Sequence, residues 1–476
     1  MSGTFYWHDY ETFGTDPGRD RPVQFAGLRT DADLNPVGEP LVLFSAPSRD
    51  VLPHPEACLV TGITPQRALA EGVPECEFIR RVHAELSQPG TCGVGYNSIR
   101  FDDEVTRFTL YRNFYDPYAR EWRDGNSRWD LIDVVRLTYA LRPDGINWPL
   151  DEEGRPSFRL EKLTEANGIE HAAAHDALSD VHATIALARL VRHHQPRLFD
   201  YALQLRDKQF AQQQLDLVNH KPVLHVSGMF GAARSNIALI APLARHPRNK
   251  NEIICWDLDA DPAPALELSA ADLAGLLFCP ASELPEGVER PGLKTVHINR
   301  SPVLVTPRLL DPEAAERLGI DGARCRRHLA ALRSAEDLPG RVQAVYGGRS
   351  HAEITDPDRM LYSGGFFSDA DRRLMDQVRA ASPEELASSN FVFEDPRGAE
   401  MLFRYRARNF PDSLDASERA QWEEYRFSYL TDPAAGASIT LEEYHARIEE
   451  LLVDATAERR ELLENLLEYG DTLLAG

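Results

Sequence analysis

Four carboxylates and one histidine are the residues of this chain whose types and spacing could do chemistry. Asp9 and Glu11 lie two residues apart in an apolar, aromatic run over residues 6–14. Such a run predicts a buried strand, on which side chains two apart point to the same face. Like charges on one face resist burial unless a cation lies between them, and hard oxygen ligands suit Mg²⁺ or Mn²⁺. An isolated pair of acids is also typical of a solvated strand end, so the metal site depends on the other acids.

The other two acids belong to two later helices predicted from the sequence. Asp102 comes after a short strand predicted at 92–96 and opens a helix. Asp180 lies inside a helix expected from Ala174 to about His194, and His175 lies at its start, five residues earlier. A lone histidine at a helix start is usually a surface residue. The acid close to it and the three earlier acids favour a functional site here instead.

The elements around the first two acids predict a mixed sheet. Strands are expected at about 4–10, 23–29 and 41–44, joined by short turns that contain glycine and proline. Three sequential strands with short links favour an antiparallel meander at one side of the sheet. Gly62 marks a tight turn, and helical periodicity follows at 77–86.

The stretch from residue 107 to 142 alternates arginine with aromatic residues. It contains Arg107, Arg112, Arg120, Arg123, Arg128, Arg136 and Arg142 among Tyr111, Phe114, Tyr115, Tyr118, Trp122 and Trp129. Arginine neutralises phosphates and aromatic faces stack bases, so this stretch could line a groove for nucleic acid. The alternative is that several of these aromatic side chains belong to the core. Trp129, Ile132 and Val135 have helical spacing and are expected there.

Length and composition indicate a globular chain of about three domains. The chain has 476 residues, 43% hydrophobic and 27% charged, and its formal net charge is −23. A nucleic acid partner therefore needs a local groove rather than a basic surface. No apolar run is long enough for a membrane span, no signal peptide is recognisable, and six scattered cysteines favour a reducing cytoplasm over a zinc or disulfide framework. We expect domains at 1–195, 196–350 (β-rich) and 351–476 (helical).

The acids and the histidine match a known pattern. Asp9-x-Glu11, Asp102 and His175-x₄-Asp180 resemble the DEDD exonuclease superfamily, in its DEDDh branch. The sister branch has a tyrosine four residues before the last acid, where this chain has Asp176. The surrounding segments resemble the bacterial exodeoxyribonuclease I family over nearly the whole chain, most weakly at 260–345. These segments are His8-Asp9-Tyr10-Glu11-Thr12-Phe13-Gly14, Gly95-Tyr96-Asn97, Arg100-Phe101-Asp102-Asp103-Glu104-Val105-Thr106-Arg107, Tyr111-Arg112-Asn113-Phe114-Tyr115-Asp116-Pro117-Tyr118, Asn126-Ser127-Arg128-Trp129-Asp130-Leu131, Ser157-Phe158-Arg159-Leu160-Glu161, His225-Val226-Ser227-Gly228-Met229-Phe230-Gly231 and Tyr405-Arg406-Ala407-Arg408-Asn409-Phe410-Pro411.

The resemblance implies a fold and an activity. The fold would be an α/β ribonuclease H-like exonuclease domain with a mixed sheet, an SH3-like β domain and a C-terminal α-helical domain. The activity would be processive 3′→5′ degradation of single-stranded DNA to 5′-mononucleotides, in DNA repair and recombination. We expect a cytoplasmic monomer.

Phosphodiester hydrolysis needs an activated water and a stabilised leaving oxyanion, which two Mg²⁺ ions, or Mn²⁺ in their place, can supply. We expect Asp9 to bridge the metals, Glu11 and Asp180 to complete the first site, and Asp102 to serve the second. Glu11 could also accept a hydrogen bond from the terminal 3′-OH. Histidine titrates near neutral pH, so His175 is the candidate general base.

Further roles concern DNA and a protein partner. The candidate DNA contacts are Ile63 as a wedge against the terminal base, Phe13, Tyr118, Trp122 and Phe158 for stacking, and Arg107, Arg136 and Arg159 for phosphates. Relatives in the family bind the acidic, apolar-tipped C-terminal tail of single-stranded DNA-binding protein. Arg142 and Tyr201 look similar to the positions used for that tail, although Arg142 could equally be an ordinary loop residue.

Two other functions remain open at this level. A proofreading exonuclease or an RNA 3′-exonuclease of the same superfamily would share the acids, but it would lack the two later domains. A non-catalytic DNA-binding or scaffold protein would share the fold, but it would have no need of five intact catalytic residues. Assays on labelled DNA and RNA with and without Mg²⁺ separate these possibilities.

Overall fold

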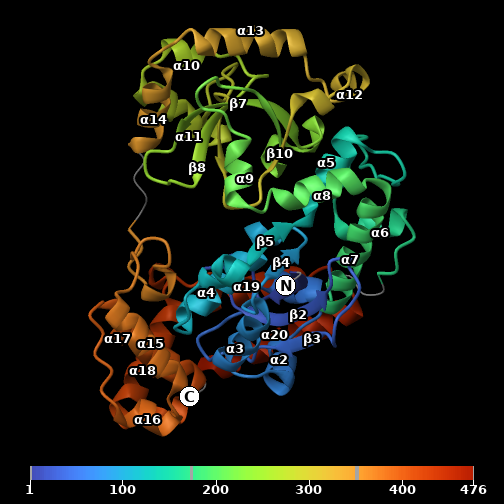
Figure 1. Cartoon of the computed structure of the whole chain (residues 1–476). Coiled ribbons are helices and arrows are strands. Elements are labelled where there is room, and N and C mark those ends of the chain that lie inside the picture. Colours follow the sequence, from blue (N-terminus) through green and yellow to red (C-terminus); the bar gives the residue numbers. More distant parts are fainter. Residues whose placement is uncertain (1–2, 172–174, 349–352, 475–476) are drawn as a thin grey trace. The chain divides into compact units, whose positions relative to one another are not determined.

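The structure, a computed structural model, describes residues 3–171, 175–348 and 353–474 and divides the chain into two compact units (Figure 1). The first unit consists of Met1–Ser127, Ala172–His182 and Ala352–Gly476, and the second of Arg128–His171 and Ala183–His351. Both the predicted acids and the C-terminal helices therefore belong to the first unit.

A five-stranded sheet carries the first two acids. Its order is β3-β2-β1-β4-β5, with β1 at Thr4–Thr12, β2 at Pro22–Thr30, β3 at Leu41–Phe44, β4 at Thr91–Gly95 and β5 at Ser127–Asp130. Strands β1, β2 and β3 pair antiparallel, and β1 pairs parallel with β4. The predicted meander within a mixed sheet is confirmed.

Helices pack on this sheet because apolar side chains recur on one of their faces. Helix α3 (Glu75–Leu86) buries Phe78, Ile79 and Val82 against Tyr6 and Tyr10 of β1. The other helices before the second unit are α1 (Pro55–Thr61), α2 (Pro65–Glu71) and α4 (Asp102–Arg112). Gly62 ends α1 with a left-handed φ of 68°, as the predicted turn requires.

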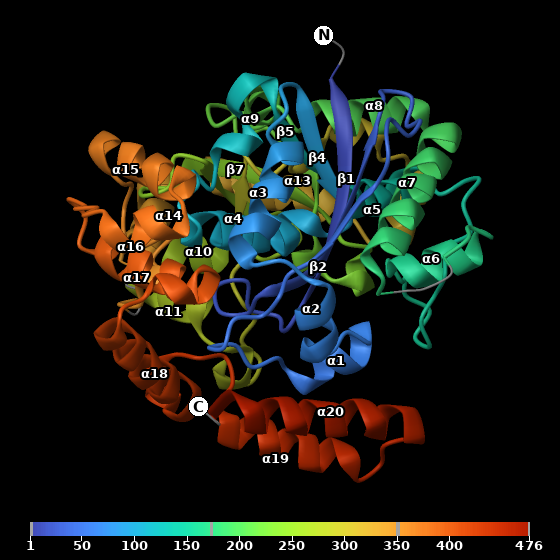
Figure 2. The same ribbon diagram turned by 90° about the horizontal axis from the view of Figure 1, so that it is seen from below.

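The C-terminal region is helical, as expected. Its helices are α15 (Asp369–Ala380), α16 (Pro383–Ser388), α17 (Arg397–Asn409), α18 (Ala416–Thr431), α19 (Leu441–Leu452) and α20 (Ala457–Leu474). Helices α19 and α20 lie side by side against α1 and α2 (Figure 2). Leu463 and Leu466 of α20 share a hydrophobic cluster with Phe13 and Ile63. This region therefore packs directly on the segment that follows β1.

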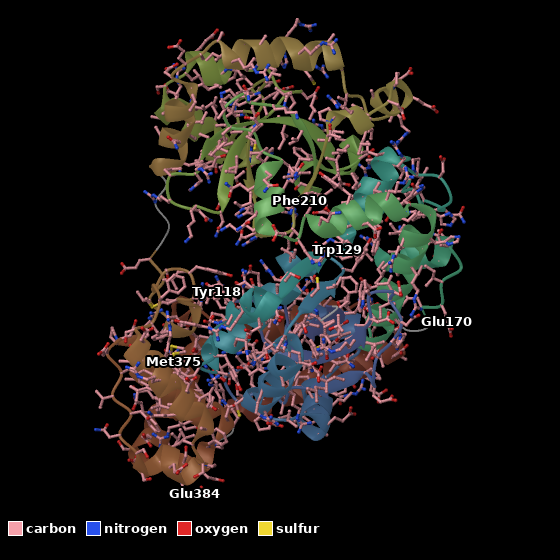
Figure 3. All side chains as sticks on the ribbon, viewed as in Figure 1. Tyr118, Trp129, Glu170, Phe210, Met375 and Glu384 are labelled. Carbon is pink, nitrogen blue, oxygen red and sulfur yellow. The ribbon has the colours of Figure 1, made fainter. Side chains whose placement is uncertain are left out.

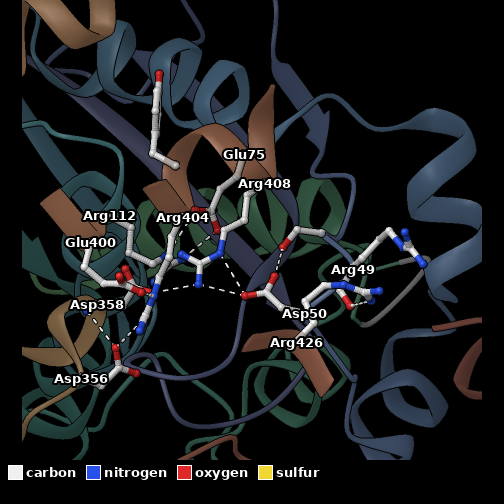
Figure 4. Close-up of polar contacts among 12 residues, drawn as sticks. Arg49, Asp50, Glu75, Arg112, Asp356, Asp358, Glu400, Arg404, Arg408 and Arg426 are labelled. Atoms are coloured by element: carbon white, nitrogen blue, oxygen red, sulfur yellow. Dashed lines mark hydrogen bonds and ion pairs between the residues drawn. The ribbon is translucent and has the colours of Figure 1, made fainter. Parts of the chain in front are cut away.

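A cluster of buried ion pairs on α17 joins the C-terminal region to Asp50 in the first part of the chain (Figure 4). Arg408 on α17 contacts Asp50 and Asp358 at 2.9 Å and 2.8 Å, and Arg404 contacts Asp358 at 3.0 Å. Burial opposes ionisation of Asp358, but the guanidinium groups of Arg408 and Arg404 outweigh it and lower its pKa. The C-terminal helices thus form part of the first unit.

The second unit contains an antiparallel sheet of order β10-β6-β7-β8-β9. Its strands are β6 (Val223–Val226), β7 (Ile237–Arg245), β8 (Glu252–Asp257), β9 (Leu293–His297) and β10 (Val303–Val305). Its helices are α5 (Leu131–Leu141), α6 (Leu160–Ala166), α8 (Pro196–Gln204), α9 (Lys208–Gln213), α10 (Ala263–Glu267), α11 (Ala270–Phe278), α12 (Pro312–Arg317), α13 (Gly322–Arg333) and α14 (Leu338–Gly347). The sequence did not predict α10 to α14; of these, α10, α11, α13 and α14 contribute apolar residues to the core beside β7 and β8.

Two local predictions need correction. Trp129 is buried, as expected, but it lies on β5 rather than on a helix and packs edge-on against Phe199. The helix that carries Asp180 is α7 (Ala177–His194), so it begins later than Ala174, which lies outside the described residues.

None of the helices within the described parts of the chain is long and apolar enough to span a membrane.

Candidate active site

Strand β1 places Asp9 and Glu11 on one face of the first sheet. Tyr6 and Tyr10 point into the core beneath α3, so the residues that alternate with them, Asp9 and Glu11, point to the opposite face. Glu11 is buried and Asp9 is half-buried. Strand β1 lies between two hydrogen-bonded neighbours, β2 and β4, and this fixes both carboxylates on a rigid support.

Asp102 reaches this strand from the start of α4. The backbone N–H of Tyr10, between the two acids of β1, donates to Asp102 Oδ1 at 3.0 Å. The next residue, Asp103, forms a buried ion pair with Arg120 at 2.6 Å. The first turn of α4 is therefore held at two consecutive residues, and the Asp102 carboxylate is buried beside Asp9 and Glu11.

Asp180 and His175 complete the group from the beginning of α7. Asp180 lies in the first turn of the helix, and its Oδ2 accepts a hydrogen bond from the backbone N–H of His175 at 3.2 Å. His175 is exposed and has a left-handed φ of 65°, which is uncommon for a residue other than glycine. A ring nitrogen of His175 and carboxylate oxygens of Glu11 and Asp180 all lie within 4.8 Å of one another. The structure thus brings together residues that are more than 160 positions apart in the sequence.

The carboxylates repel one another. Burial, and then the charges of Asp102, Glu11, Asp180 and Asp176, raise the pKa of Asp9 well above its ordinary value. Burial, Asp180 and Asp102 raise the pKa of Glu11 from 4.5 to about 9. A divalent cation would relieve this repulsion, and carboxylate oxygens with one imidazole nitrogen are suitable ligands for it. The donor set therefore fits the predicted divalent metal site.

These pKa shifts predict that metal binding releases protons. Without metal, Glu11, with its pKa of about 9, is largely protonated at neutral pH, and a metal must displace its proton. The affinity for Mn²⁺ should therefore rise between pH 6 and 9. Titration calorimetry at pH 7.5 in two buffers of different ionisation enthalpy should show protons released, and Glu11→Gln should release fewer.

The same shifts set the sign of the stability effect. A carboxyl with a raised pKa in the folded state stabilises the metal-free fold below its ordinary pKa, and this contribution is lost as the pH rises through about 9 for Glu11. As the pH rises from 5 to 9 without metal, the wild type should therefore lose stability relative to Glu11→Gln. The measurement is the difference between their unfolding temperatures. A difference that stays constant over this range would contradict the raised pKa.

The predicted DNA contacts of the first unit differ in exposure. Phe13 and Ile63 are only 1% and 2% exposed and pack in the hydrophobic cluster with α20, so neither presents a free apolar face in this structure. Arg107 is buried and paired with Glu104 and Glu121, at 2.9 Å and 2.7 Å, because its guanidinium would otherwise be uncompensated. It is therefore not a free phosphate ligand here.

Tyr118 and Trp122 are more accessible. Trp122 is 64% exposed, whereas Tyr118 is half-buried at the edge of the cluster that contains Met375 (Figure 3). The guanidinium of Arg107 lies 5.3 Å from the centroid of the Tyr118 ring. Their contacts with DNA stay predictions.

The remaining predicted contacts belong to the second unit. Phe158 is buried against Tyr139 and Trp148, and Arg136 pairs with Asp133 at 2.7 Å. Arg159, at the N-terminus of α6, is exposed. Of these three residues, Arg159 is the one with a side chain open to solvent.

The two residues predicted to bind a protein tail also lie in the second unit. Arg142 follows α5, is half-buried, and donates through Nη1 to the backbone carbonyl of Leu309 at 3.3 Å. Tyr201 on α8 is half-buried, and its hydroxyl donates to the carbonyl of Leu304 at 2.9 Å. Each of the two side chains is thus held by a hydrogen bond to a backbone carbonyl.

Gln24 also belongs to this site, although no sequence pattern predicts it. This residue pairs with Glu11 across β1 and β2, and its side chain contacts the residues immediately before and at the start of α7. A glutamine in a buried strand has no sequence signal of its own. Only the register of β1 against β2 reveals that it faces the acids.

Comparison with known proteins identifies the family over the whole chain. The family described as Exonuclease matches residues 6–188, the Exonuclease I SH3-like domain matches 206–348, and the Exonuclease I C-terminal domain matches 355–473. The exodeoxyribonuclease I of Escherichia coli K12 is 50% identical over 432 residues, which cover 90% of each chain. That of Haemophilus influenzae is 46% identical over 475 residues, which cover 99% of each chain.

Solved structures agree. Exonuclease I from the moderately thermophilic Methylocaldum szegediense is 55% identical, with a TM-score of 0.95 over 99% of this chain and 100% of that one. E. coli exonuclease I in complex with a dA16 oligonucleotide is 47% identical, with the same score and the same coverage. A zinc-bound complex of that enzyme with single-stranded DNA matches equally well over 100% of both chains. The first domain is thus an exonuclease domain, followed by an SH3-like domain and a helical C-terminal domain, and the chain belongs to the exodeoxyribonuclease I family.

Proposed function

We propose that this protein is a 3′→5′ exonuclease that degrades single-stranded DNA processively to 5′-mononucleotides, with two divalent metal ions, in DNA repair and recombination. The observation that carries this proposal is the convergence of Glu11, Asp180 and His175 within 4.8 Å, with Asp9 and Asp102 at the same place. The E. coli relative was solved with a dA16 oligonucleotide and in a complex with single-stranded DNA, and this supports the choice of substrate.

The carboxylates would hold the metals. We assign Asp9 as the bridging ligand, Glu11 and Asp180 as further ligands of the first ion, and Asp102 as a ligand of the second. When bound, two divalent ions lower the pKa of a water molecule and stabilise the leaving oxyanion. We propose Mg²⁺ as the physiological metal, because carboxylate oxygens dominate the donor set.

The remaining steps use the chain's own side chains. His175 is exposed beside the acids, so it can take the proton from the attacking water as general base. Glu11 can accept a hydrogen bond from the terminal 3′-OH and so place the last phosphodiester bond in the site. The N–H of Tyr10 donates to Asp102, and this hydrogen bond holds the Asp102 carboxylate beside β1.

Substrate binding would use exposed aromatic and basic side chains. We propose Trp122, with Tyr118, as a stacking surface and Arg159 as a phosphate contact. Roles for Phe13, Ile63, Arg107, Arg136 and Phe158 would require these side chains to leave their present partners on DNA binding. We propose that the protein acts as a monomer in the cytoplasm.

Labelled oligonucleotides test the proposal. Single-stranded DNA with a free 3′-OH should be shortened from the 3′ end in Mg²⁺, whereas a 3′-phosphate should slow cleavage and blunt duplex DNA should resist it. Paired bases cannot spread onto aromatic faces, which is the physical reason for the last expectation. RNA of the same sequence should be cut poorly. Equal rates on duplex and single strand, or on RNA and DNA, would contradict the proposal.

We also propose that the second unit binds the acidic, apolar-tipped C-terminal tail of single-stranded DNA-binding protein through Arg142 and Tyr201. A local cation on a chain of net charge −23 would select such a tail at short range.

Arg142→Ala should weaken binding of a tail peptide and reduce its dependence on salt, because one ionic contact is lost. Titration calorimetry at two salt concentrations measures both effects, and Arg155→Ala, which removes an arginine from the same unit, is the control. Unchanged affinity in both Arg142→Ala and Tyr201→Ala would place the tail elsewhere.

A further inference from the structure

Gln24 connects the sheet to the segment that carries His175 and Asp180. It lies on β2 opposite Glu11, is 3% exposed, and uses both polar atoms of its side chain. Its Nε2 donates to Asp176 Oδ1 at 3.2 Å, and its Oε1 accepts from the backbone N–H of Ala177 at 3.3 Å. One side chain thus contacts two consecutive residues of the chain at the beginning of α7.

Asp176, which accepts the hydrogen bond from Gln24, is the N-terminal cap of α7. The other carboxylate oxygen of Asp176 accepts from the backbone N–H of Ser179 at 3.2 Å, and its carbonyl accepts from the N–H of Asp180 at 3.0 Å. Asp176 therefore binds Gln24 with one oxygen and caps α7 with the other. The position of the cap fixes the next helical turn, which contains Asp180, and the preceding residue, His175, whose N–H donates to Asp180.

The chemistry of glutamine suits this place. Asp176 acts on both Asp9 and Glu11 through its charge, so another acid here would add to the repulsion in the site. A lysine or arginine would pair with the acids and compete with a metal ion. The position needs an uncharged side chain that offers one donor and one acceptor and reaches from β2 to α7. Asparagine has the same amide group, but its side chain is one methylene shorter.

The support behind Gln24 is rigid. Its backbone pairs with Glu11 on one side and with Phe44 of β3 on the other, so β2 is held by both neighbours. Gln24 therefore holds both parts of the site. Its backbone pairs with Glu11, and its side chain binds Asp176 and Ala177 at the start of α7. The distance between Glu11 and Asp180 depends on both connections.

We propose that Gln24 is a positioning residue of the active site, whose side-chain amide docks the capped start of α7 against the acidic strand and so sets Asp180 and His175 relative to Glu11. Gln24 acts through its hydrogen bonds to Asp176 and Ala177. The proposal rests on the proposed nuclease function for its kinetic test, but not for its metal-binding test.

The first test replaces Gln24 by leucine, which fills similar space without the two hydrogen bonds. Displacement of catalytic groups by about 1 Å can cost on the order of 10²-fold in rate, so kcat on long single-stranded DNA should fall by roughly 10- to 100-fold. KM should change little, because most contacts with a long strand lie outside the site. Calorimetry of the DNA-free protein should show weaker Mn²⁺ binding. Gln66→Leu is a matched control, since the Gln66 amide also bonds across the first unit, to the carbonyl of Asn465 near the C-terminus, and it should leave all three values unchanged.

A donor–acceptor exchange makes the test specific. Gln24→Glu places a carboxylate against Asp176 and should reduce kcat and Mn²⁺ affinity at least as much as Gln24→Leu. Asp176→Asn added to Gln24→Glu supplies the missing donor at the same net charge as the wild type, and should restore most of both losses. This rescue distinguishes positioning from general packing, because the double substitution changes more atoms than the single one.

The outcomes separate the two proposals. If Gln24→Leu is too unstable to purify, the comparison of Gln24→Glu with the double substitution decides the question. No rescue in the double variant, or a fall in unfolding temperature without any change in kcat or Mn²⁺ affinity, would overturn the positioning role. If the wild type cuts no DNA, the nuclease proposal fails, while the Mn²⁺ measurements still test Gln24.

Discussion

Replacement of Asp9, Asp102 or Asp180 by asparagine should reduce hydrolysis of single-stranded DNA to the level measured without metal. Each substitution keeps the size of the side chain but removes a negative ligand from a site where the acids lie close enough to raise the pKa of Asp9. A metal held by fewer carboxylates binds more weakly and activates water less. Binding of long single-stranded DNA should largely survive, because most of the proposed contacts lie elsewhere. Turnover in Mg²⁺ and DNA binding by fluorescence anisotropy measure the two effects.

A stability measurement checks the physical reason. The ionised acids repel one another without metal, so removing one of them should raise the unfolding temperature of the metal-free protein more at high pH than at low pH. The same substitution should abolish the extra stabilisation that Mn²⁺ gives the wild type. Asp33→Asn, an exposed acid of the same unit, is the charge-matched control and should change neither value. Wild-type turnover in any of the three active-site variants would overturn the assignment of four metal-binding acids.

The part of the site that could be predicted from the sequence depends on local rules. Alternation along a strand places Asp9 and Glu11 on one face, and a helix start after a strand places Asp102 at the end of the sheet. Asp180 and His175 lie close in sequence, so one helix start brings both. The resemblance to a known family then joined these three local pieces into one site.

The contacts that hold the site could not be predicted in this way. Gln24 and Asp176 are 152 residues apart and meet only because β2 pairs with β1 in one register. Phe13 is buried because α20, from the far end of the chain, packs over the segment after β1. Burial by a distant segment leaves no periodic signal near Phe13 itself, so the sequence alone predicts a stacking role for this aromatic residue beside the acids.

The middle of the chain shows the same limit. Alternating apolar runs predicted the strands of the second unit, but the helices between them and after them were missed. Helix α11 is apolar on most of its surface, and its Leu273 and Leu277 share a core with Ile254 and Trp256 of β8. A short helix without a strong polar face has no clear 3.6-residue pattern. The resemblance to relatives was also weakest there.

Replacement of His175 by alanine should lower kcat by roughly 10²- to 10⁴-fold, the usual contribution of a general base. The side chain is exposed next to Glu11 and Asp180, so it can reach a water molecule in the site without a change in the buried core. If it acts only as a base, Mn²⁺ affinity should stay within about twofold of wild type, because its removal leaves all four carboxylates. The pH dependence of kcat should change, since the group that accepts the proton has gone. His182→Ala, an exposed histidine on the same helix, should be silent in both measurements.

The geometry allows one definite alternative, and the same experiment identifies it. A ring nitrogen of His175 lies within 4.8 Å of oxygens from Glu11 and Asp180, a spacing at which the three side chains could share one ion. Imidazole suits Zn²⁺, whereas Mg²⁺ and Mn²⁺ prefer oxygen ligands. If His175 is a ligand, His175→Ala should weaken Zn²⁺ binding much more than Mg²⁺ binding, and the pH dependence of the residual activity should match that of the wild type. Loss of turnover with unchanged affinity for all three metals would leave proton transfer as the function of this residue.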